Sequence, residues 1–299
     1  MTRIILGIVL VFCAVVSGQT EYGDMLLPAG AFLWLPTDAA TDALGGAATA
    51  EGGRTSAGWA NPATLFSGGD FSAGATYTYS RYKTFNSGAF ATKRIGNWAG
   101  AARFFLMDSG DIEARSGPTT EPDYTFTSHQ LYLQFAGARR ITDFMALGTS
   151  AKWVHERIDQ DTRDGWIFDF GIAGNYKFMK AGIAIKNWGA EEVAFKIYQE
   201  RYPITYRAGL AAKVLDYGTI RADWVKPDKL GGWLAIGAEW NANSLLTVRA
   251  GYTPGHDTRN ISGGIGTKYC NFNLDYALVN YSEGLGISHQ VTLTYAPSE

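Results

Sequence analysis

The sequence predicts an all-β protein, an antiparallel up-and-down transmembrane β-barrel of about 14 strands with an N-terminal plug segment. Three observations predict this fold. Segments of about 9 to 12 residues alternate between apolar and polar side chains, and a tilted strand needs that length to cross a bilayer. The connections between these segments alternate between short and long, as in membrane barrels. A stretch typical of a secretory signal precedes them.

Composition supports this fold class and excludes others. The chain has 299 residues, a formal net charge of -2 and a pI near 6.1, so it lacks the basic excess expected of a protein with a nucleic-acid partner. Aromatic residues make up 14% of the chain, yet its mean hydropathy is only -0.09. A membrane barrel has this combination because its apolar and polar residues alternate and cancel in the average.

Residues 1–18 have the pattern of a secretory signal peptide. Arg3 supplies the positive charge, Ile4 to Val16 the apolar stretch, and Val16-Ser17-Gly18 a small-residue cleavage site. The apolar stretch is too short for a transmembrane helix. Cys13 raises the alternative of a lipoprotein anchor, but the bulky Phe12 before it fits a lipidation site poorly. We therefore expect export to the cell outer membrane.

The domain organisation follows from this signal. Residues 1–18 are expected to be the signal peptide, 19–66 a periplasmic lead and N-terminal plug, and 67–299 the barrel. Once the signal is removed, Cys270 is the only cysteine in the sequence. A single cysteine makes no internal disulfide, so we do not expect a disulfide-stapled fold.

The predicted plug runs from Pro36 to Phe66. This stretch is too rich in Gly and Ala to form a core of its own and too apolar for a plain linker. A short helix is expected over Ala39 to Leu44. Barrels of about 8 strands are filled by their own side chains, whereas about 14 strands leave an interior that another segment must occupy.

Alternation of period two begins at Phe71, where Phe71, Ala73, Ala75, Tyr77 and Tyr79 share one face. Such alternation predicts a strand with one apolar side. Further strands are predicted at Ser87 to Ile95, Asn97 to Met107, His129 to Arg140, Met145 to Ile158, Gly165 to Lys177, Met179 to Asn187, Pro203 to Lys213, Tyr217 to Val225, Gly232 to Asn241, Ser244 to Tyr252, Arg259 to Tyr269, Asn271 to Val279 and Ile287 to Tyr295.

The connections between these strands predict which end of the barrel faces the periplasm, where membrane barrels have their short turns. The first hairpin, around Thr84 to Asn86, is short although it is expected outside. The longer connections are Met107 to His129, Ile158 to Gly165, Asn187 to Pro203, Val225 to Gly232, Tyr252 to Arg259 and Val279 to Ile287. The tight links lie at Thr142-Asp143, Phe178, Leu215-Asp216, Ala242-Asn243 and Cys270. An even number of strands places both chain ends at the periplasmic rim.

One face of each strand is apolar and is expected to contact lipid. This face comprises Leu131, Leu133, Phe135, Trp166, Phe168, Phe170, Ile172, Ile204, Tyr206, Ala208, Leu210, Leu234, Ile236, Ala238, Trp240, Leu246, Val248, Ala250, Tyr252, Phe272, Leu274, Tyr276, Leu278, Val291, Leu293 and Tyr295. Several rings near strand ends suit the headgroup level, namely Trp153, Trp166, Trp224, Trp240, Tyr252 and Tyr295. A soluble sandwich would also alternate, but strand length and the signal disfavour it.

The opposite face carries charges that are expected to line the lumen. They are Asp169, Arg207, Arg221, Asp223, Glu239, Arg249, Lys268 and Asp275. Four are basic and four acidic, so neighbouring strands are expected to pair them with each other or with the plug. A selective pore needs a ring of one sign, which makes a salt-bridged interior the favoured interpretation over an ion filter.

Two motifs resemble those of a known family. Asp42-Ala43-Leu44-Gly45-Gly46-Ala47, followed by Trp59-Ala60-Asn61-Pro62-Ala63, resembles the N-terminal signature of PorV/PorQ-type outer-membrane proteins, which are related to FadL-like long-chain fatty-acid transporters. The stretch from Leu274 to Val291, which contains Leu274-Asp275-Tyr276-Ala277 and Gly284-Leu285-Gly286, resembles the closing hairpin of that family. The plug residues that the resemblance singles out are Gly45, Gly46, Trp59, Asn61, Pro62 and Ala63.

This chain departs from the family pattern at several positions. Asp42 stands where the family commonly has Arg, Glu51-Gly52-Gly53 replaces an Asp pair, and Thr64 replaces a Gly. Any role of those family acids is therefore in doubt for this chain. Asn61-Pro62 has a physical rationale of its own, because Pro keeps Asn61 out of helical space while the Asn side chain can satisfy backbone groups. Structural anchoring and direct contact with a ligand or partner both stay open for Asn61.

The resemblance implies two functions. The first is a part in protein secretion or surface export, in which the barrel contacts secreted proteins or components of a type IX system. The aromatic loop from Glu191 to Tyr202, with Phe195 and Tyr198, would favour such a partner. The alternative is a gated transporter of hydrophobic small molecules, which a continuous apolar lumen would favour. A structural surface anchor is a second alternative.

Catalysis is not expected. The four histidines, His129, His155, His256 and His289, lie in no nucleophile motif and have no metal-ligand spacing. The sequence therefore predicts neither catalytic nor metal-binding residues, and it predicts no cofactor. The expected partners are outer-membrane lipid and either secreted proteins or a hydrophobic ligand, without nucleic acid.

Overall fold

The computed structural model describes residues 30–51, 58–80, 84–189, 193–195, 198–200, 202–228 and 230–297. The predicted signal peptide and most of the lead after it lie outside these residues. Within the described part of the chain, no helix is both long and apolar enough to cross a membrane.

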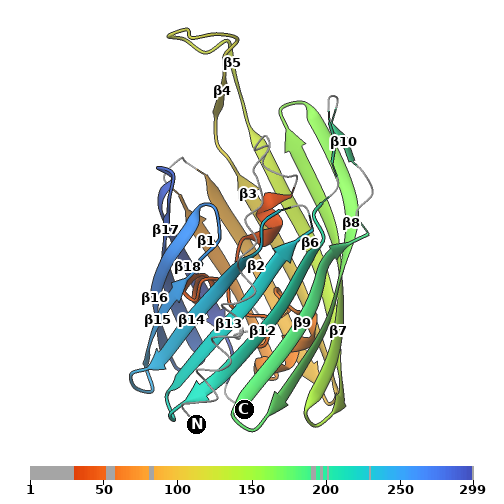
Figure 1. Cartoon of the computed structure of the whole chain (residues 1–299), viewed down its shortest axis with the longest axis vertical. Helices are drawn as coiled ribbons and strands as arrows, with labels where there is room; N and C mark the ends of the chain where they lie inside the picture. The colour runs from red at the N-terminus through yellow and green to blue at the C-terminus, as the bar shows by residue number, and fades with distance from the viewer. Residues whose placement is uncertain are drawn as a thin grey trace.

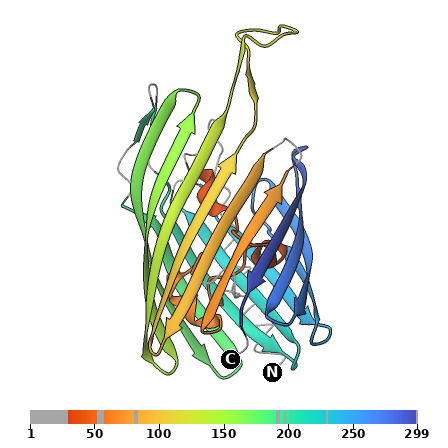
Figure 2. The ribbon, with the colours of Figure 1, turned by 180° about the vertical axis from the view of Figure 1, so that it is seen from behind.

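Fourteen antiparallel strands close into one barrel, in which β1 pairs with both β2 and β18 (Figures 1 and 2). The predicted fold class is confirmed. In barrel order from the N-terminus, the strands are β1 (Phe71–Tyr79), β2 (Phe85–Ile95), β3 (Trp98–Asp108), β6 (Ser128–Thr142), β7 (Met145–Ile158), β8 (Asp161–Tyr176), β9 (Met179–Trp188), β12 (Thr205–Val214), β13 (Gly218–Pro227), β14 (Trp233–Asn241), β15 (Leu246–Tyr252), β16 (Arg259–Tyr269), β17 (Phe272–Tyr281) and β18 (Gly286–Tyr295).

The remaining elements are short. In the described residues three helices precede the barrel: η1 (Ala31–Trp34), α2 (Ala39–Ala43) and η2 (Pro62–Ser67). The predicted helix over Ala39 to Leu44 corresponds to α2. Two small hairpins that the sequence did not predict extend the long connections, namely β4 (Ile112–Ala114) with β5 (Tyr124–Phe126), and β10 (Val193–Phe195) with β11 (Tyr198–Glu200).

Short turns gather at one rim and longer connections at the other (Figure 1). The start of β1 and the end of β18 lie together at the short-turn rim, where Ala73 is opposite Tyr295. One predicted loop is wrong. Residues 158–165 are not a long connection, because β8 begins at Asp161 after a tight turn in which Asp159 has φ 55°. The charged residues there extend the hairpin, with Arg163 bonding Glu156 and His155 bonding Asp164.

The outward face of the wall is apolar, as the alternation predicted. Phe135, Ile172 and Leu293 are 62%, 50% and 49% exposed, whereas inward neighbours such as Gln134 and Thr292 are buried. Leu234 is an exception at 7% exposed, and its N–H donates to Pro254 O of the β15–β16 connection at 3.0 Å. The wall thus has the surface of a barrel that spans a membrane.

A charged substitution on this outward face tests the membrane assignment. Ile183 lies midway along β9 and is 62% exposed. We expect Ile183→Arg to lower the free energy of unfolding in lipid vesicles by about 2–4 kcal/mol, since the mid-plane of a bilayer solvates a guanidinium poorly. Urea titration of the reconstituted protein measures this change.

The matched control is Tyr269→Arg, because Tyr269 is 77% exposed but stands at the end of β16, at the rim. There the expected cost is only about 0–1 kcal/mol. Equal and small effects at both positions would contradict a lipid-facing wall.

Candidate functional site in the barrel interior

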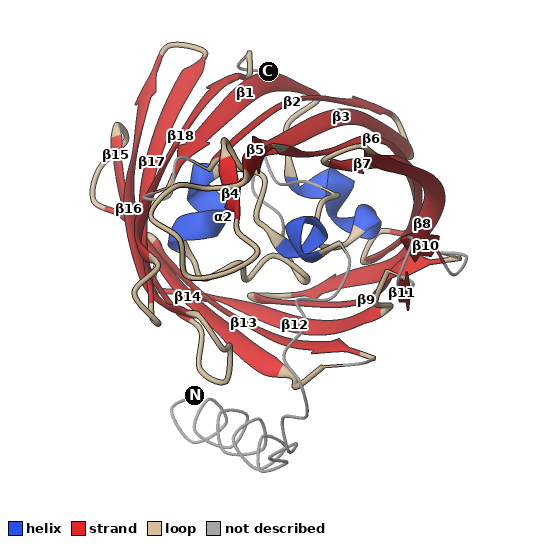
Figure 3. Ribbon diagram, turned by 90° about the horizontal axis from the view of Figure 1, so that it is seen from above, coloured by secondary structure: helices blue, strands red, loops and turns tan. Residues whose placement is uncertain are grey.

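The N-terminal segment, residues 30–51 and 58–67, lies inside the barrel (Figure 3). We call it the inner segment. Its helices contact different parts of the wall: α2 contacts β15 to β18, whereas η2 contacts β2, β3 and β6 to β8. Because a segment with little regular structure leaves many backbone groups unpaired, the wall has to supply hydrogen-bond partners for it.

Asn61 holds two parts of the inner segment to the wall. Its side-chain oxygen accepts from the N–H of Ala63 at 3.0 Å and thereby caps η2, whose first residue is Pro62. Its Nδ2 donates to Thr49 O at 2.9 Å and to Ile172 O of β8 at 3.0 Å. Asn61 is 0% exposed, and every one of these bonds is to a backbone group. This geometry is that of an anchor.

The wall makes room for this anchor with two glycines. A Cβ at Gly171 of β8 would overlap the Asn61 side chain, and one at Gly182 of β9 would overlap the carbonyl of Thr49. Asn61 can reach the carbonyl of Ile172 because the two glycines carry no side chain at this place in the wall. Composition alone would not have singled out these wall glycines.

Asp223 on β13 is the acceptor on which the inner segment converges. Its Oδ2 accepts from the N–H groups of Ala48 and Thr49, both at 2.9 Å, and from Thr49 Oγ1 at 2.6 Å. Arg207 on β12 pairs with the same oxygen at 2.8 Å and also donates to Gly46 O at 2.8 Å. Asp223 and Arg207 are 1% and 5% exposed in their side chains. Two of the predicted lumen charges thus bind the predicted plug segment, and Arg207 contacts Gly46 of the plug motif.

The remaining residues of the plug motif lie nearby. Gly45 and Gly46 have φ of 69° and 85°, a region that Gly adopts without strain, and the Gly45 N–H donates to Ser262 Oγ at 3.1 Å. Trp59 is buried, with Lys186 Nζ 4.3 Å and the Arg207 guanidinium 5.3 Å from its ring centroid. These distances allow cation–π contacts with both side chains.

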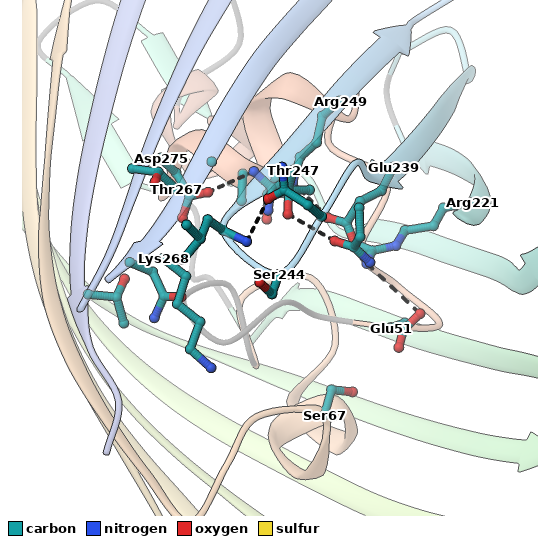
Figure 4. A pocket seen from close by; sticks show the side chains of 18 residues that line it. Glu51, Ser67, Arg221, Glu239, Ser244, Thr247, Arg249, Thr267, Lys268 and Asp275 are labelled. Carbon is teal, nitrogen blue, oxygen red and sulfur yellow. Dashed lines mark hydrogen bonds and ion pairs between the residues drawn. The ribbon is translucent and has the colours of Figure 1, made fainter. Parts of the chain in front are cut away.

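Side chains of alternating charge form a continuous chain inside the barrel, separate from the contacts of Asp223 (Figure 4). Asp275 pairs with Arg249 at 2.7 Å, Arg249 with Glu239 at 2.6 Å, and Glu239 with Arg221 at 3.6 Å. The inner segment joins this chain through Glu51, which lies 3.9 Å from Arg221 and pairs with Lys180 of β9. Sequence reasoning missed Glu51 and Lys180 as partners.

All of these charges except Lys180 line a cavity of about 440 Å³ near the short-turn rim. Other lining side chains are also polar, among them Ser67, Thr247, Asn273 and Thr294. Lys268 lines the cavity too but is exposed, unlike the seven other predicted lumen charges. Since cations and anions alternate through the chain of charges, the cavity has no ring of one sign.

A second charged cluster surrounds Asp169 on β8. Its carboxylate is 0% exposed and pairs with Lys152 of β7 at 2.7 Å. It also accepts from Ser150 Oγ and from the N–H of Asn187, both at 2.9 Å. Sequence reasoning missed Lys152, although it lies on the polar face of β7.

Asn187 was missed because a bulge in β9 turns it inward. The β8–β9 register shifts between Phe168 and Phe170, and Asn187 has φ 59°. As a result, Lys186 and Asn187 are both buried although they are consecutive, a break in alternation that a bulge produces.

The half of the interior nearer the longer connections contains an apolar cluster, which we call the upper cluster. The wall contributes Phe105, Tyr132, Val154 and Ile167, from β3, β6, β7 and β8. The inner segment contributes Phe32 and Leu33, and the connection before β12 contributes Tyr202. Tyr202 is 1% exposed, so it is not available to a protein partner outside the barrel, contrary to the prediction for this loop. The side chains of Phe195 and Tyr198 lie outside the described residues.

The upper cluster is connected to the β15–β16 connection by aromatic rings in edge-to-face contact. Trp34 of η1 contacts Trp233 edge-on at 6.0 Å between centroids, and Trp233 contacts His256 at 4.8 Å. His256 Nδ1 accepts from the N–H groups of Thr258 at 3.3 Å and of Arg259 at 3.1 Å. Burial lowers the pKa of His256 to about 4. The positive charge of nearby Arg259 also lowers this pKa, whereas the negative charge of Asp257 raises it.

The four histidines lie at separate places. His129 pairs with Asp108 at 2.6 Å, His155 with Asp164 at 2.9 Å, and His289 bonds the Tyr276 hydroxyl at 2.8 Å. In the described residues no group of three or more His, Cys, Asp or Glu side chains could hold a metal ion.

The fold and the interior together define the class of protein, which is a closed antiparallel β-barrel with an apolar outer wall and its N-terminal segment inside. No family model and no curated protein matches the sequence. Solved structures do match. The toluene transporter TbuX of Ralstonia pickettii aligns with a TM-score of 0.65 and 15% identity, over 88% of this chain and 98% of that one.

Two further structures have the same fold. The monoaromatic hydrocarbon channel CymD aligns with a TM-score of 0.66 and 13% identity, over 89% of this chain and 99% of that one. A FadL homologue of Pseudomonas aeruginosa aligns with a TM-score of 0.62 and 10% identity, over 87% and 98%. The FadL-like part of the sequence resemblance is thus confirmed at the level of the fold, and its PorV/PorQ part stays a prediction.

Removal of the Asp223 charge tests the anchoring of the inner segment. Asp223→Asn leaves Arg207 buried without its counter-ion, and we expect a loss of about 3–5 kcal/mol in the free energy of unfolding. The same change should loosen residues 46–49 and produce conductance steps in planar bilayers, where the unmodified chain stays closed.

Asp216→Asn is the control for this prediction, because Asp216 is an exposed acid in the turn between the same two strands. It should leave both stability and conductance unchanged. A closed and fully stable Asp223→Asn protein would contradict the role given to Asp223.

The pKa of His256 predicts a pH dependence for the β15–β16 connection. If this connection opens, the pKa returns toward its ordinary value of 6.5, so between pH 6.5 and about 4 only the open form binds the proton. The closed form is therefore fully stable above this range and loses stability as the pH falls through it. The protection factors of the Thr258 and Arg259 amides against hydrogen exchange should fall as the pH is lowered through this range, and His256→Gln should remove that pH dependence. Persistence of the pH dependence in His256→Gln would assign it to another group.

Proposed function

We propose that the chain is a gated channel for small hydrophobic molecules in the outer membrane, with the inner segment as its plug. The similar solved structures include a toluene transporter and a monoaromatic hydrocarbon channel, which supports this alternative over the secretion role. The organisation into a signal peptide, a plug and a barrel belongs to the same proposal, because an exported barrel needs a signal.

The observation that carries the proposal is the upper cluster. An interior that only had to be filled and salt-bridged would not need four apolar side chains on its wall near one mouth. Phe105 and Tyr132 stack there with ring centroids 5.2 Å apart, and Val154 and Ile167 are 0% exposed. A pocket with such a lining suits a small apolar ligand.

The inner segment occupies the space that this ligand would take. Phe32 and Leu33 are 3% and 2% exposed and pack on the same wall residues. A hydrophobic ligand that enters from this mouth therefore competes with η1 for apolar contacts. A ligand that binds to the wall at this place displaces Phe32 and Leu33 and exposes them. The free energy of ligand binding must therefore exceed the free-energy cost of this displacement.

In this proposal the lumen charges hold the wall and the plug together and do not select ions. Each link in the chain from Asp275 to Lys180 joins opposite charges. Asp223 and Asn61 hold the part of the plug that follows α2. Displacement of η1 thus leaves the rest of the plug in place, so that passage is controlled in steps.

A secretion role is the second function that the sequence resemblance implied. The aromatic loop that would favour a protein partner places Tyr202 inside the barrel, which removes part of the reason for this role. A purely structural anchor would not require the upper cluster.

Uptake measurements test the proposal. We expect cells that express the chain to take up radiolabelled toluene faster than cells with an empty vector. The double variant Val154→Thr/Ile167→Thr adds two hydroxyls to the upper cluster; Val154→Thr keeps the side-chain volume, and Ile167→Thr makes the side chain smaller. Two polar groups without partners weaken apolar binding, so uptake should fall at least about tenfold.

The matched control is Val248→Thr/Ile265→Thr, because this pair has the same residue types, faces outward and is 43% and 53% exposed. It should transport like the unmodified chain. Uptake equal to the empty vector, or a fully active Val154→Thr/Ile167→Thr protein, would overturn the proposal.

A further inference from the structure

The outward wall of β1 to β3 contains a groove near the short-turn rim. Its volume is about 430 Å³, and its lining includes Phe71, Ala91, Ile95, Trp98, Gly100 and Ala102. Ile95 and Trp98 are 71% and 58% exposed and stand at the rim end of the groove. The groove is thus an apolar hollow in the belt that faces lipid.

Packing of the wall does not require this hollow. Gly100 of β3 is directly opposite Gly137 of β6. A Cβ at Gly137 would meet no atom within 4 Å, and one at Gly100 would come no closer than 3.8 Å to Ala136 O. At Gly171 and Gly182, by contrast, a Cβ would overlap the inner segment. Larger side chains would therefore fit at Gly100 and Gly137, and their absence leaves space for a molecule outside the barrel.

Two cations lie at the rim end of the groove. Lys93 lines it, and the guanidinium of Arg139 lies 5.0 Å from the ring centroid of Trp98. The nearby carboxylate of Asp70 is paired with Arg94 at 2.7 Å. Among the described residues, neither Lys93 nor Arg139 has a carboxylate within ion-pair distance. An apolar groove that ends at two cations complements an amphipathic anion.

We propose that this groove binds an acyl chain of an anionic phospholipid, with the headgroup phosphate at Lys93 and Arg139. The hydrocarbon around the wall supplies the chain, and basic residues at the membrane surface attract anionic headgroups. A second copy of the chain fits less well, because the apolar surface of the groove is far below the roughly 1,200 Å² that a stable protein interface buries.

Native mass spectrometry of the full chain in detergent tests this proposal. Delipidated protein is titrated with phosphatidylglycerol or with phosphatidylethanolamine of the same acyl chains. We expect tighter binding of phosphatidylglycerol. In Lys93→Gln/Arg139→Gln, the affinity for this lipid should fall about fivefold for each cation removed, which is the effect of one basic residue at an anionic membrane surface.

Each variant has a matched control. Lys177→Gln removes a cation that lies 5.2 Å from the ring centroid of Tyr176 at the same rim, but away from the groove. Gly100→Leu fills the groove and should weaken both lipids, whereas Ala181→Leu enlarges an exposed residue of β9 outside it. Heat-modified migration on gels checks that every variant is folded.

Three results would overturn the proposal. They are equal affinity for the two lipids in the unmodified chain, unchanged affinity in Lys93→Gln/Arg139→Gln, and unchanged affinity in Gly100→Leu. A dimer that Gly100→Leu dissociates would assign the groove to a second copy of the chain.

Discussion

The contact between the Asp223 carboxylate and the inner segment is the constraint on which the rest of the interior depends. A segment with three short helices cannot satisfy its own backbone, and inside a barrel it has little water to do so. Asp223 Oδ2 accepts from two consecutive backbone N–H groups and from Arg207, so one buried anion fixes both the segment and a neighbouring strand. Asn61 is linked to this contact, because its Nδ2 donates to the carbonyl of Thr49, and α2 lies just before it in the chain.

The interior has three zones, each with a different physical role. Near the longer connections, the upper cluster offers apolar surface that η1 covers. In the middle, Asp223 and Asp169 hold buried cations and backbone donors in place. Toward the short turns, alternating charges line a polar cavity. Under the proposed function, a small apolar molecule that entered at this mouth would meet the upper cluster first and the anchored part of the inner segment next.

Most of the wall could be predicted, because alternation of period two is a local property of each strand. The predicted Met145 to Ile158 and Arg259 to Tyr269 match β7 and β16 at both ends. The start of β8 was predicted too late, at Gly165. The charged residues before it, from Asp161 to Asp164, were interpreted as a loop, although they pair with β7. Tyr202 was predicted outside because its burial depends on Phe32, which is distant in sequence.

By itself, the sequence determined which side chains point inward, since alternation decides the face of each residue once a strand forms. Alternation therefore identified Arg207 and Asp223 as lumen candidates, whereas Asn61 was identified by its motif. Only the tertiary structure decided their partners, because pairing depends on strand neighbours, on register and on the path of the inner segment. Glu51 meets Arg221 across 170 residues of chain, and Asn187 turns inward only through a bulge. Contacts of this kind have no local signal, since each depends on strand register or on the path of the inner segment.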